Sequence, residues 1–317
     1  MSSEETSKPG FSLSKFLIGR PLETTALLDQ RVTKRVGLAV FASDALSSTA
    51  YATEEILIIL ALAGTSASTL GVSIPIAIAI AILLVIVTIS YRQTIFAYPN
   101  GGGAYIVARD NLGELPAQIA GAALLTDYIL TVAVSTSAGV AQITSGFPDL
   151  LPYRVEIAIG VIVVMTIVNL RGVRESGQIF AVPTYFFIFT MFATLIVGVI
   201  RAITGSLDTV TGVEVVHSTS QSLTLFLVLR AFSSGCTALT GIEAISNGIM
   251  AFKEPRSRNA AVTLVWMSTI LIALFLGITF LAHQIGALPS ETETIISQIG
   301  RAVYGEDNII YILVLAG

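Results

Sequence analysis

The chain has 317 residues, of which 54% are hydrophobic and 12% are charged, and its formal net charge is −4. Its mean hydropathy is +0.82. Because about a quarter of the residues in soluble domains are charged, this composition excludes an ordinary soluble protein. The single cysteine, Cys236, excludes an intrachain disulfide framework.

The chain begins with a polar segment, residues 1–35, which holds six Lys and Arg residues and is expected to lie in the cytoplasm. Apolar runs then recur, each long enough to cross about 30 Å of hydrocarbon as a helix. These runs predict membrane helices at residues 36–61, 71–91, 115–145, 154–170, 179–204, 222–251 and 259–283. An eighth helix is expected to begin near residue 308 and to be truncated by the end of the chain.

Lys and Arg residues are distributed unevenly between the connecting segments. With the N-terminus inside the cell, thirteen of the 17 lie in cytoplasmic segments, three in external segments and one, Arg230, within a helix. Such an excess of basic residues is typical of the cytoplasmic side of membrane proteins. The distribution predicts a multi-pass protein of the plasma membrane with a cytoplasmic N-terminus.

Three consecutive glycines, Gly101 to Gly103, lie between the second and third predicted helices. A glycine-rich phosphate cradle would need a strand before it and a helix after it. Because this segment connects membrane helices, we interpret it as a tight intracellular turn that leads into a surface helix.

Polar residues interrupt two of the predicted spans. The first contains FASDALSSTAYATEEIL, and the sixth contains SSGCTALTGIEAISNG at residues 233–248. Residues 44–47 match residues 237–240, and the two spans are five apart, which indicates an inverted repeat with discontinuous helices 1 and 6. The predicted domains are therefore a first five-helix repeat at 36–204 and an incomplete second repeat at 205–317.

Acidic residues lie deep in three spans: Asp44, Asp127 and Glu243. A charged side chain at a helix centre costs about 2.5–3.5 kcal/mol. The nearest base, Arg230, is 13 residues from Glu243, roughly 20 Å along a helix, so it is not a local partner. A cation or a proton is the indicated counterpart. Structural hydrogen bonding by the acids, and close packing of the small residues, are the alternatives.

The third span supplies an oxygen-rich face. Asp127, Thr131 and Ser135 follow one another at intervals of four residues, with Tyr128 beside them. Carboxylate and hydroxyl oxygens bind hard cations, whereas soft metals prefer Cys, His or Met. His217 and His283 have no partner at ligand spacing. The sequence therefore predicts a site for a hard cation.

Several segments together resemble potassium importers of the KimA type, which belong to the amino acid–polyamine–organocation superfamily. The resemblance begins near Phe16 and extends to the end of the chain. The segments are FASDALSSTAYATEEIL, YPNGGGAY, TDYILTVAVS, VNLRGVRES and AFSSGCTALTGIEAISNGIMAFKEPRSRNAA. The resemblance implies an all-α LeuT-type fold and import of potassium coupled to protons by alternating access, without a cofactor or enzymatic activity. The potassium-binding positions of the family fall on Asp44, Tyr51, Asp127, Tyr128, Thr131, Ser135, Thr240 and Glu243.

Within this expected site, Glu243 is the candidate proton carrier. The expected partners are membrane lipid, K⁺ and H⁺, and no nucleic acid. The resemblance also implies further membrane helices and a C-terminal domain that receives a regulatory cyclic dinucleotide, and it is compatible with a homodimer. The 317-residue chain is not expected to transport by itself.

Other function classes fit the sequence less well. The nearest alternative is an amino acid or polyamine permease on the same fold. The three acids disfavour an anionic or neutral substrate, although a polyamine cation is compatible with them. A potassium channel would need a filter such as TVGYG, which the sequence lacks. An intramembrane enzyme would need machinery such as HExxH or GxSxG, and neither motif is present.

Overall fold

The structure is a computed structural model that describes residues 31–170, 173–213, 221–306 and 308–317. Within these ranges the regular elements are helices, and β-type pairing amounts to one isolated parallel bridge between Val32 and Phe252. The all-α fold class is therefore confirmed. The predicted N-terminal segment up to residue 30 and His217 lie outside the described residues.

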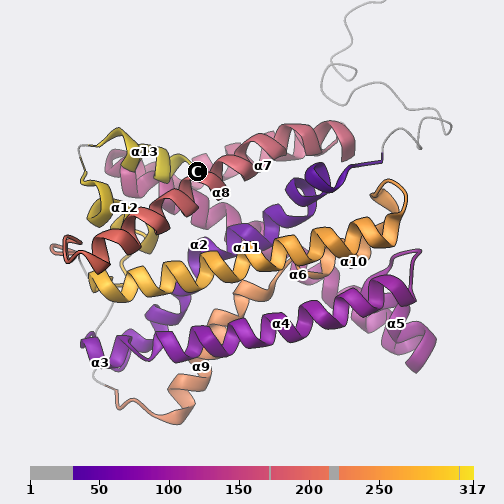
Figure 1. The fold of residues 1–317 in the computed structure, drawn as a ribbon, viewed down its shortest axis with the longest axis horizontal. Helices are drawn as coiled ribbons and strands as arrows, with labels where there is room; N and C mark the ends of the chain where they lie inside the picture. Colours follow the sequence, from indigo (N-terminus) through magenta and orange to yellow (C-terminus); the bar gives the residue numbers. More distant parts are fainter. Residues whose placement is uncertain (1–30, 171–172, 214–220, 307) are drawn as a thin grey trace, which may run out of the picture.

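The predicted spans correspond to α2 (Lys34–Ala61), α4 (Ser73–Ala97), α6 (Glu114–Gly146), α7 (Arg154–Asn169), α8 (Val173–Ile203), α9 (Leu225–Gly235) and α11 (Arg256–Ile285). The shorter helices are α3 (Ala67–Leu70), α5 (Gly103–Leu112), α10 (Glu243–Asn247), α12 (Ile295–Tyr304) and α13 (Ile309–Ala316). The 3₁₀ turns are η2 (Pro148–Tyr153), η3 (Cys236–Leu239) and η4 (Ile249–Ala251). Figure 1 shows α4 and α11 running along the long axis of the molecule, with α2 crossing the middle of the bundle.

Five helical segments are long and apolar enough to cross a membrane. Among the described residues they are Ala67–Ala97, Glu114–Gly146, Pro148–Asn169, Gly177–Ile203 and Arg256–Ile285. α2 is not among them. The apolar helical segment that starts with α9, Leu225–Leu239, is shorter than these five. These are the two spans in which the sequence predicts polar interruptions. α2 buries 16 residues, whereas α7 buries none. The polar span is thus covered by protein, as polar groups within a membrane require.

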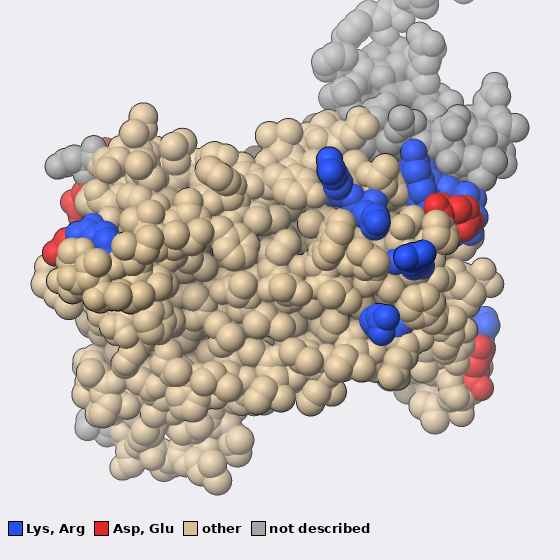
Figure 2. Space-filling model, viewed as in Figure 1, with Lys and Arg blue, Asp and Glu red and all other residues tan. Residues whose placement is uncertain are grey.

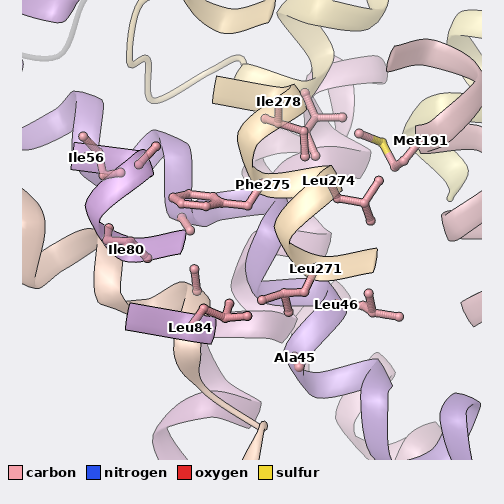
Figure 3. Close-up of a cluster of buried hydrophobic side chains, with 14 of the residues drawn as sticks. Ala45, Leu46, Ile56, Ile80, Leu84, Met191, Leu271, Leu274, Phe275 and Ile278 are labelled. Carbon is pink, nitrogen blue, oxygen red and sulfur yellow. The ribbon is translucent and has the colours of Figure 1, made fainter. Parts of the chain in front are cut away.

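The apolar core lies where α2, α4, α8 and α11 meet (Figure 3). Ile56 of α2, Ile80 and Leu84 of α4, and Phe275 of α11 are each 0% exposed. Met191 of α8 is 1% exposed. This close packing holds α2 against α11 and α4 and so determines where the polar residues of α2 lie.

Hydroxyl pairs within the core connect α11 to both of its neighbours. The Thr53 and Thr279 hydroxyls are 2.9 Å apart between α2 and α11. The Thr88 hydroxyl of α4 donates to Ser268 of α11 at 2.8 Å. Because a hydrogen bond forms only within a narrow range of distance and angle, these pairs define how the helices are rotated about their axes.

The interruption predicted in the first span is not present, because α2 is one helix from Lys34 to Ala61. The hydroxyls of Ser47, Ser48 and Thr49 donate to carbonyl oxygens three residues earlier, at 2.8, 2.6 and 2.7 Å. The hydroxyl groups are therefore satisfied within the helix itself. The prediction of a discontinuous first helix was wrong, because these side chains bond to the helical backbone without opening it.

Candidate functional site

The polar segment of the sixth span separates two short helices, and the interruption predicted there is confirmed. α9 ends at Gly235, η3 follows, and Thr240 is extended at φ −66° and ψ 147° before α10 begins at Glu243. Gly241 has φ +81°, a left-handed conformation that glycine adopts without steric cost. Gly241 packs directly against Asp44 of α2. The break in the sixth span therefore lies beside Asp44 of the first.

Three acidic side chains approach this region from three helices. Asp44 comes from α2, Asp127 from α6 and Glu243 from the first turn of α10. The carboxylate of Asp44 lies within electrostatic range of Asp127, and that of Glu243 within range of both. The described residues nevertheless contain no group of three His, Cys, Asp or Glu side chains close enough to hold a metal ion. The three acids therefore surround a region without forming a compact carboxylate cluster.

Hydroxyl groups lie between these elements. Ser47 of α2 and Ser135 of α6 have their hydroxyl oxygens 3.1 Å apart. The Tyr51 hydroxyl lies beside those of Ser135 and Thr240. Thr131, one helical turn before Ser135, is 8% exposed. The eight predicted site residues thus lie on α2, on α6 and in the broken sixth span, and the polar faces of these elements meet.

Sequence reasoning missed two residues that border the acids. Asn247, the last residue of α10, donates from Nδ2 to the Tyr128 hydroxyl at 2.8 Å. The Tyr91 side chain of α4 lies within electrostatic range of Glu243 and Asp127. Asn247 follows Glu243 by four residues, so helical spacing could have found it. Tyr91 carries no comparable signal, because it lies near the polar end of α4, beside Ser90 and Arg92, where a tyrosine is common at a membrane interface.

Buried oxygen atoms without a hydrogen-bond partner gather in the same region. Buried polar groups in folded proteins almost always have a partner, so each such atom calls for an explanation. Carboxylate, hydroxyl and amide oxygens are suitable ligands for a hard cation. Among the described residues, the unpartnered oxygens here are Asp44 Oδ1, Thr237 Oγ1, Glu243 Oε1 and Ser246 Oγ. Asn247 Oδ1 is also unpartnered, but it lies against Gly103. The chemistry of this donor set fits a dehydrated cation.

The remaining residues considered from the sequence lie elsewhere or have another role. His283 lies near the C-terminal end of α11 and lines a small cavity with Leu70 and Gly286. Cys236 begins the η3 turn, as expected for a residue of the break. Arg230 is exposed on α9 and forms no salt bridge within the described residues. It is therefore not the counterion of the acids.

Comparison with known proteins agrees with this architecture. A family model described as "Amino acid permease" matches residues 38–305. The chain belongs to this family. Permeases are transporters, so the predictions of a permease fold and of a multi-pass membrane transporter rather than an enzyme are confirmed at the level of the family.

Two relatives of this permease are informative. It is 51% identical over 307 residues to "Potassium transporter KimA" of Bacillus subtilis (strain 168), across 95% of this chain and 49% of that protein. It is 25% identical over 214 residues to "Cationic amino acid transporter 6, chloroplastic" of Arabidopsis thaliana, across 63% of this chain and 34% of that protein. The chain thus spans about half the length of the first relative and about a third of the second.

Proposed function

We propose that the protein imports potassium ions by secondary active transport, coupled to the entry of protons. The observation that carries this proposal is the set of unpartnered buried oxygens around Asp44 and Glu243, beside which the described part of the chain places no basic side chain to balance the acids. The similarity to a protein named as a potassium transporter supports K⁺ as the ion.

In this proposal the ion exchanges its water for oxygen atoms of the protein. Asp44 and Asp127 supply negative charge from α2 and α6. The oxygen ligands proposed beside them are those of Tyr51, Tyr128, Thr131, Ser135 and Thr240, with Glu243 next to them. Backbone carbonyls freed at the break, where Thr240 and Gly241 leave the helix, add partial negative charge.

Glu243 is the proposed proton carrier. It begins α10, is 9% exposed, and has one buried carboxylate oxygen without a partner among the described residues. A bound proton and a nearby cation both balance the charge of a carboxylate. Protonation of Glu243 therefore affects binding of the cation at the site, and binding of the cation affects protonation. Movement of the helices would then expose the site to each side of the membrane in turn.

The orientation in the membrane is part of the proposal. Figure 2 shows Lys and Arg gathered toward one end of the molecule, where α2 and α11 begin and α4 leads into α5. We call this the basic end; by their positions on or beside these elements it includes Lys34, Arg92, Arg109, Lys253 and Arg258. Because basic residues favour the cytoplasmic side, we assign the basic end and the N-terminus to the cytoplasm.

The larger assembly is proposed on the family resemblance alone. The chain covers 49% of the Bacillus subtilis relative, so any part of that protein beyond the match is not represented here. We extend the proposal to a homodimer of the full-length protein and to regulation by a cyclic dinucleotide bound at a C-terminal domain.

A second candidate is transport of an organic cation such as a cationic amino acid or a polyamine. The similarity to a protein named as a cationic amino acid transporter favours it. The acids around the break suit an ammonium group as well as a metal cation. An amino acid carboxylate would lie close to Asp44 and Glu243, however, and like charges repel, which disfavours the amino acid.

Uptake of labelled rubidium tests the proposal. The full-length protein is expressed in cells that lack other potassium importers, and uptake is measured with and without an agent that collapses the proton gradient. We expect saturable uptake that falls when the gradient collapses and that excess lysine or putrescine does not inhibit. Uptake of labelled lysine or putrescine without uptake of rubidium would establish the second candidate instead.

A further inference from the structure

The triglycine loop that connects α4 to α5 packs onto the end of α10. Gly101, Gly102 and Gly103 have φ values of +78°, +93° and +43°, which favour glycine at each position. The Gly102 amide donates to the carbonyl oxygen of Asn247 at 3.4 Å. A β-carbon at Gly101 would stand 2.7 Å from that same oxygen, and one at Gly103 would overlap Asn247 Oδ1. The loop therefore fits around Asn247 because it has no side chains.

Asn247 links this loop to the candidate site. Its side-chain amide donates to the Tyr128 hydroxyl at 2.8 Å, and Tyr128 follows Asp127 on α6. Its backbone carbonyl receives the amide of Gly102. One residue thus joins the loop to a tyrosine that lies within electrostatic range of Glu243 and Asp44.

The role of the Asn247 contact follows from where it lies relative to Glu243 and the basic end. α10 runs from Glu243 to Asn247, toward the segment that carries Lys253 and leads into α11. α5, which follows the loop, packs on α6 and carries Arg109. The contact of Asn247 with the loop therefore lies on the side of Glu243 that faces the basic end, where Figure 1 shows α10 close to α5 and to the start of α11.

We infer that Asn247 is a positioning residue. Clamped by the triglycine loop, it holds Tyr128 in place and closes the basic-end side of the site; we call this contact the glycine clamp. The inference rests on the proposed function for its consequence in transport, but the clamp itself is a structural contact that is testable without a transported ion. Release of the clamp opens the path between Glu243 and the basic end and frees Tyr128.

Access to a buried cysteine measures the closure directly. Ser246 is 0% exposed and lies between Glu243 and Asn247. The substitution Ser246→Cys is made in the full-length protein after every other cysteine, including Cys236, has been replaced. Labelling by a membrane-permeant maleimide is then compared with and without Asn247→Ala or Gly103→Ala. Asn247→Ala removes the hydrogen bond to Tyr128, and Gly103→Ala displaces the Asn247 side chain that makes it. Loss of this one hydrogen bond should accelerate labelling by roughly two- to tenfold.

The chain offers a matched control for each variant. The Asn111 amide also donates to a tyrosine hydroxyl, that of Tyr98, at 3.2 Å, but this pair is exposed. Gly113 also has a positive φ, +98°, but nothing lies within 4 Å of a β-carbon there. Asn111→Ala and Gly113→Ala should leave the labelling rate unchanged. The clamp would be overturned if a variant and its control accelerated maleimide labelling equally, or if neither of them accelerated it.

Rubidium uptake tests the consequence for the site. Asn247→Ala and Tyr128→Phe remove the same hydrogen bond, so each should raise the apparent KM for rubidium, and the double variant should match the more impaired single one. An unchanged KM in Asn247→Ala, or additive effects, would show that Asn247 does not position Tyr128. If wild-type protein takes up no rubidium while the labelling result holds, the potassium function fails and the clamp stands.

Discussion

Gly241 lies in direct contact with Asp44, and this contact joins the broken sixth span to α2. A β-carbon at Gly241 would stand 2.9 Å from Asp44 Oδ2 and 2.8 Å from the backbone nitrogen of Ala45. Asp44 Oδ1 is buried and has no hydrogen-bond partner among the described residues. The absence of a side chain at Gly241 therefore allows the break to reach the acid.

Gly241→Ala should abolish rubidium uptake by the full-length protein, because the new methyl group would displace Asp44. The positive φ adds a strain of about 1 kcal/mol or more. The control is Gly205→Ala, at φ +69° with nothing within 4 Å of a β-carbon, which carries similar strain without touching the site. Thermal stability and uptake are measured for both. Normal uptake by Gly241→Ala would show that the contact does not serve the site.

Asp127→Asn should raise the apparent KM for rubidium about tenfold or more, because a charged oxygen ligand becomes neutral. The control is Asp149→Asn in the η2 turn, an exposed acid that follows α6 and should have no effect. Uptake is measured over a range of rubidium concentrations. An unaltered KM in Asp127→Asn would count against direct coordination by this carboxylate.

Glu243→Gln should leave the protein folded and abolish proton-coupled uptake, because the amide cannot exchange a proton in this pH range. The matched control is Glu156→Gln, an exposed acid in the first turn of α7. Rubidium uptake is measured at acidic and at neutral pH, with folding checked by size-exclusion chromatography. Full uptake with an unchanged pH dependence would remove Glu243 from this role.

Thr53→Val should destabilise the protein by about 1 kcal/mol, because it removes a buried hydrogen bond between α2 and α11. The partner hydroxyl of Thr279 keeps a second bond, to the Phe275 carbonyl at 2.9 Å, which limits the loss. The control is Thr269→Val, whose hydroxyl bonds only within α11 among the described residues and is exposed. Thermal unfolding in detergent measures the difference. Equal stability of the two variants would show that the pair contributes nothing.

Much of the fold could be predicted from local sequence. The apolar runs predict α4, α6 and α11 closely, because insertion of a helix depends on the composition of about 20 consecutive residues. The glycine and hydroxyl residues of the sixth span predict its break, and the structure places that break between Gly235 and Glu243. α12 was not predicted, because its ten residues are too few to span and its burial comes from other helices.

The candidate site could be predicted only in part. Asp44, Asp127 and Glu243 are visible in the sequence, because an acid in an apolar run is conspicuous. The glycine clamp is not visible, because it joins Asn247 to a loop more than a hundred residues earlier. The same limit explains the error in the first span, where hydroxyl residues that suggested a break instead bond to carbonyl oxygens of their own helix.

By itself the sequence determined which spans carry oxygen and charge, because the cost of placing a polar group in hydrocarbon is a property of each segment alone. The tertiary structure decided which of these groups meet. Contact between Gly241 and Asp44, or between Asn247 and Tyr128, depends on the depth and rotation of whole helices. Packing around residues such as Phe275 and Ile56 sets these positions, and it involves parts of the chain that are far apart in sequence.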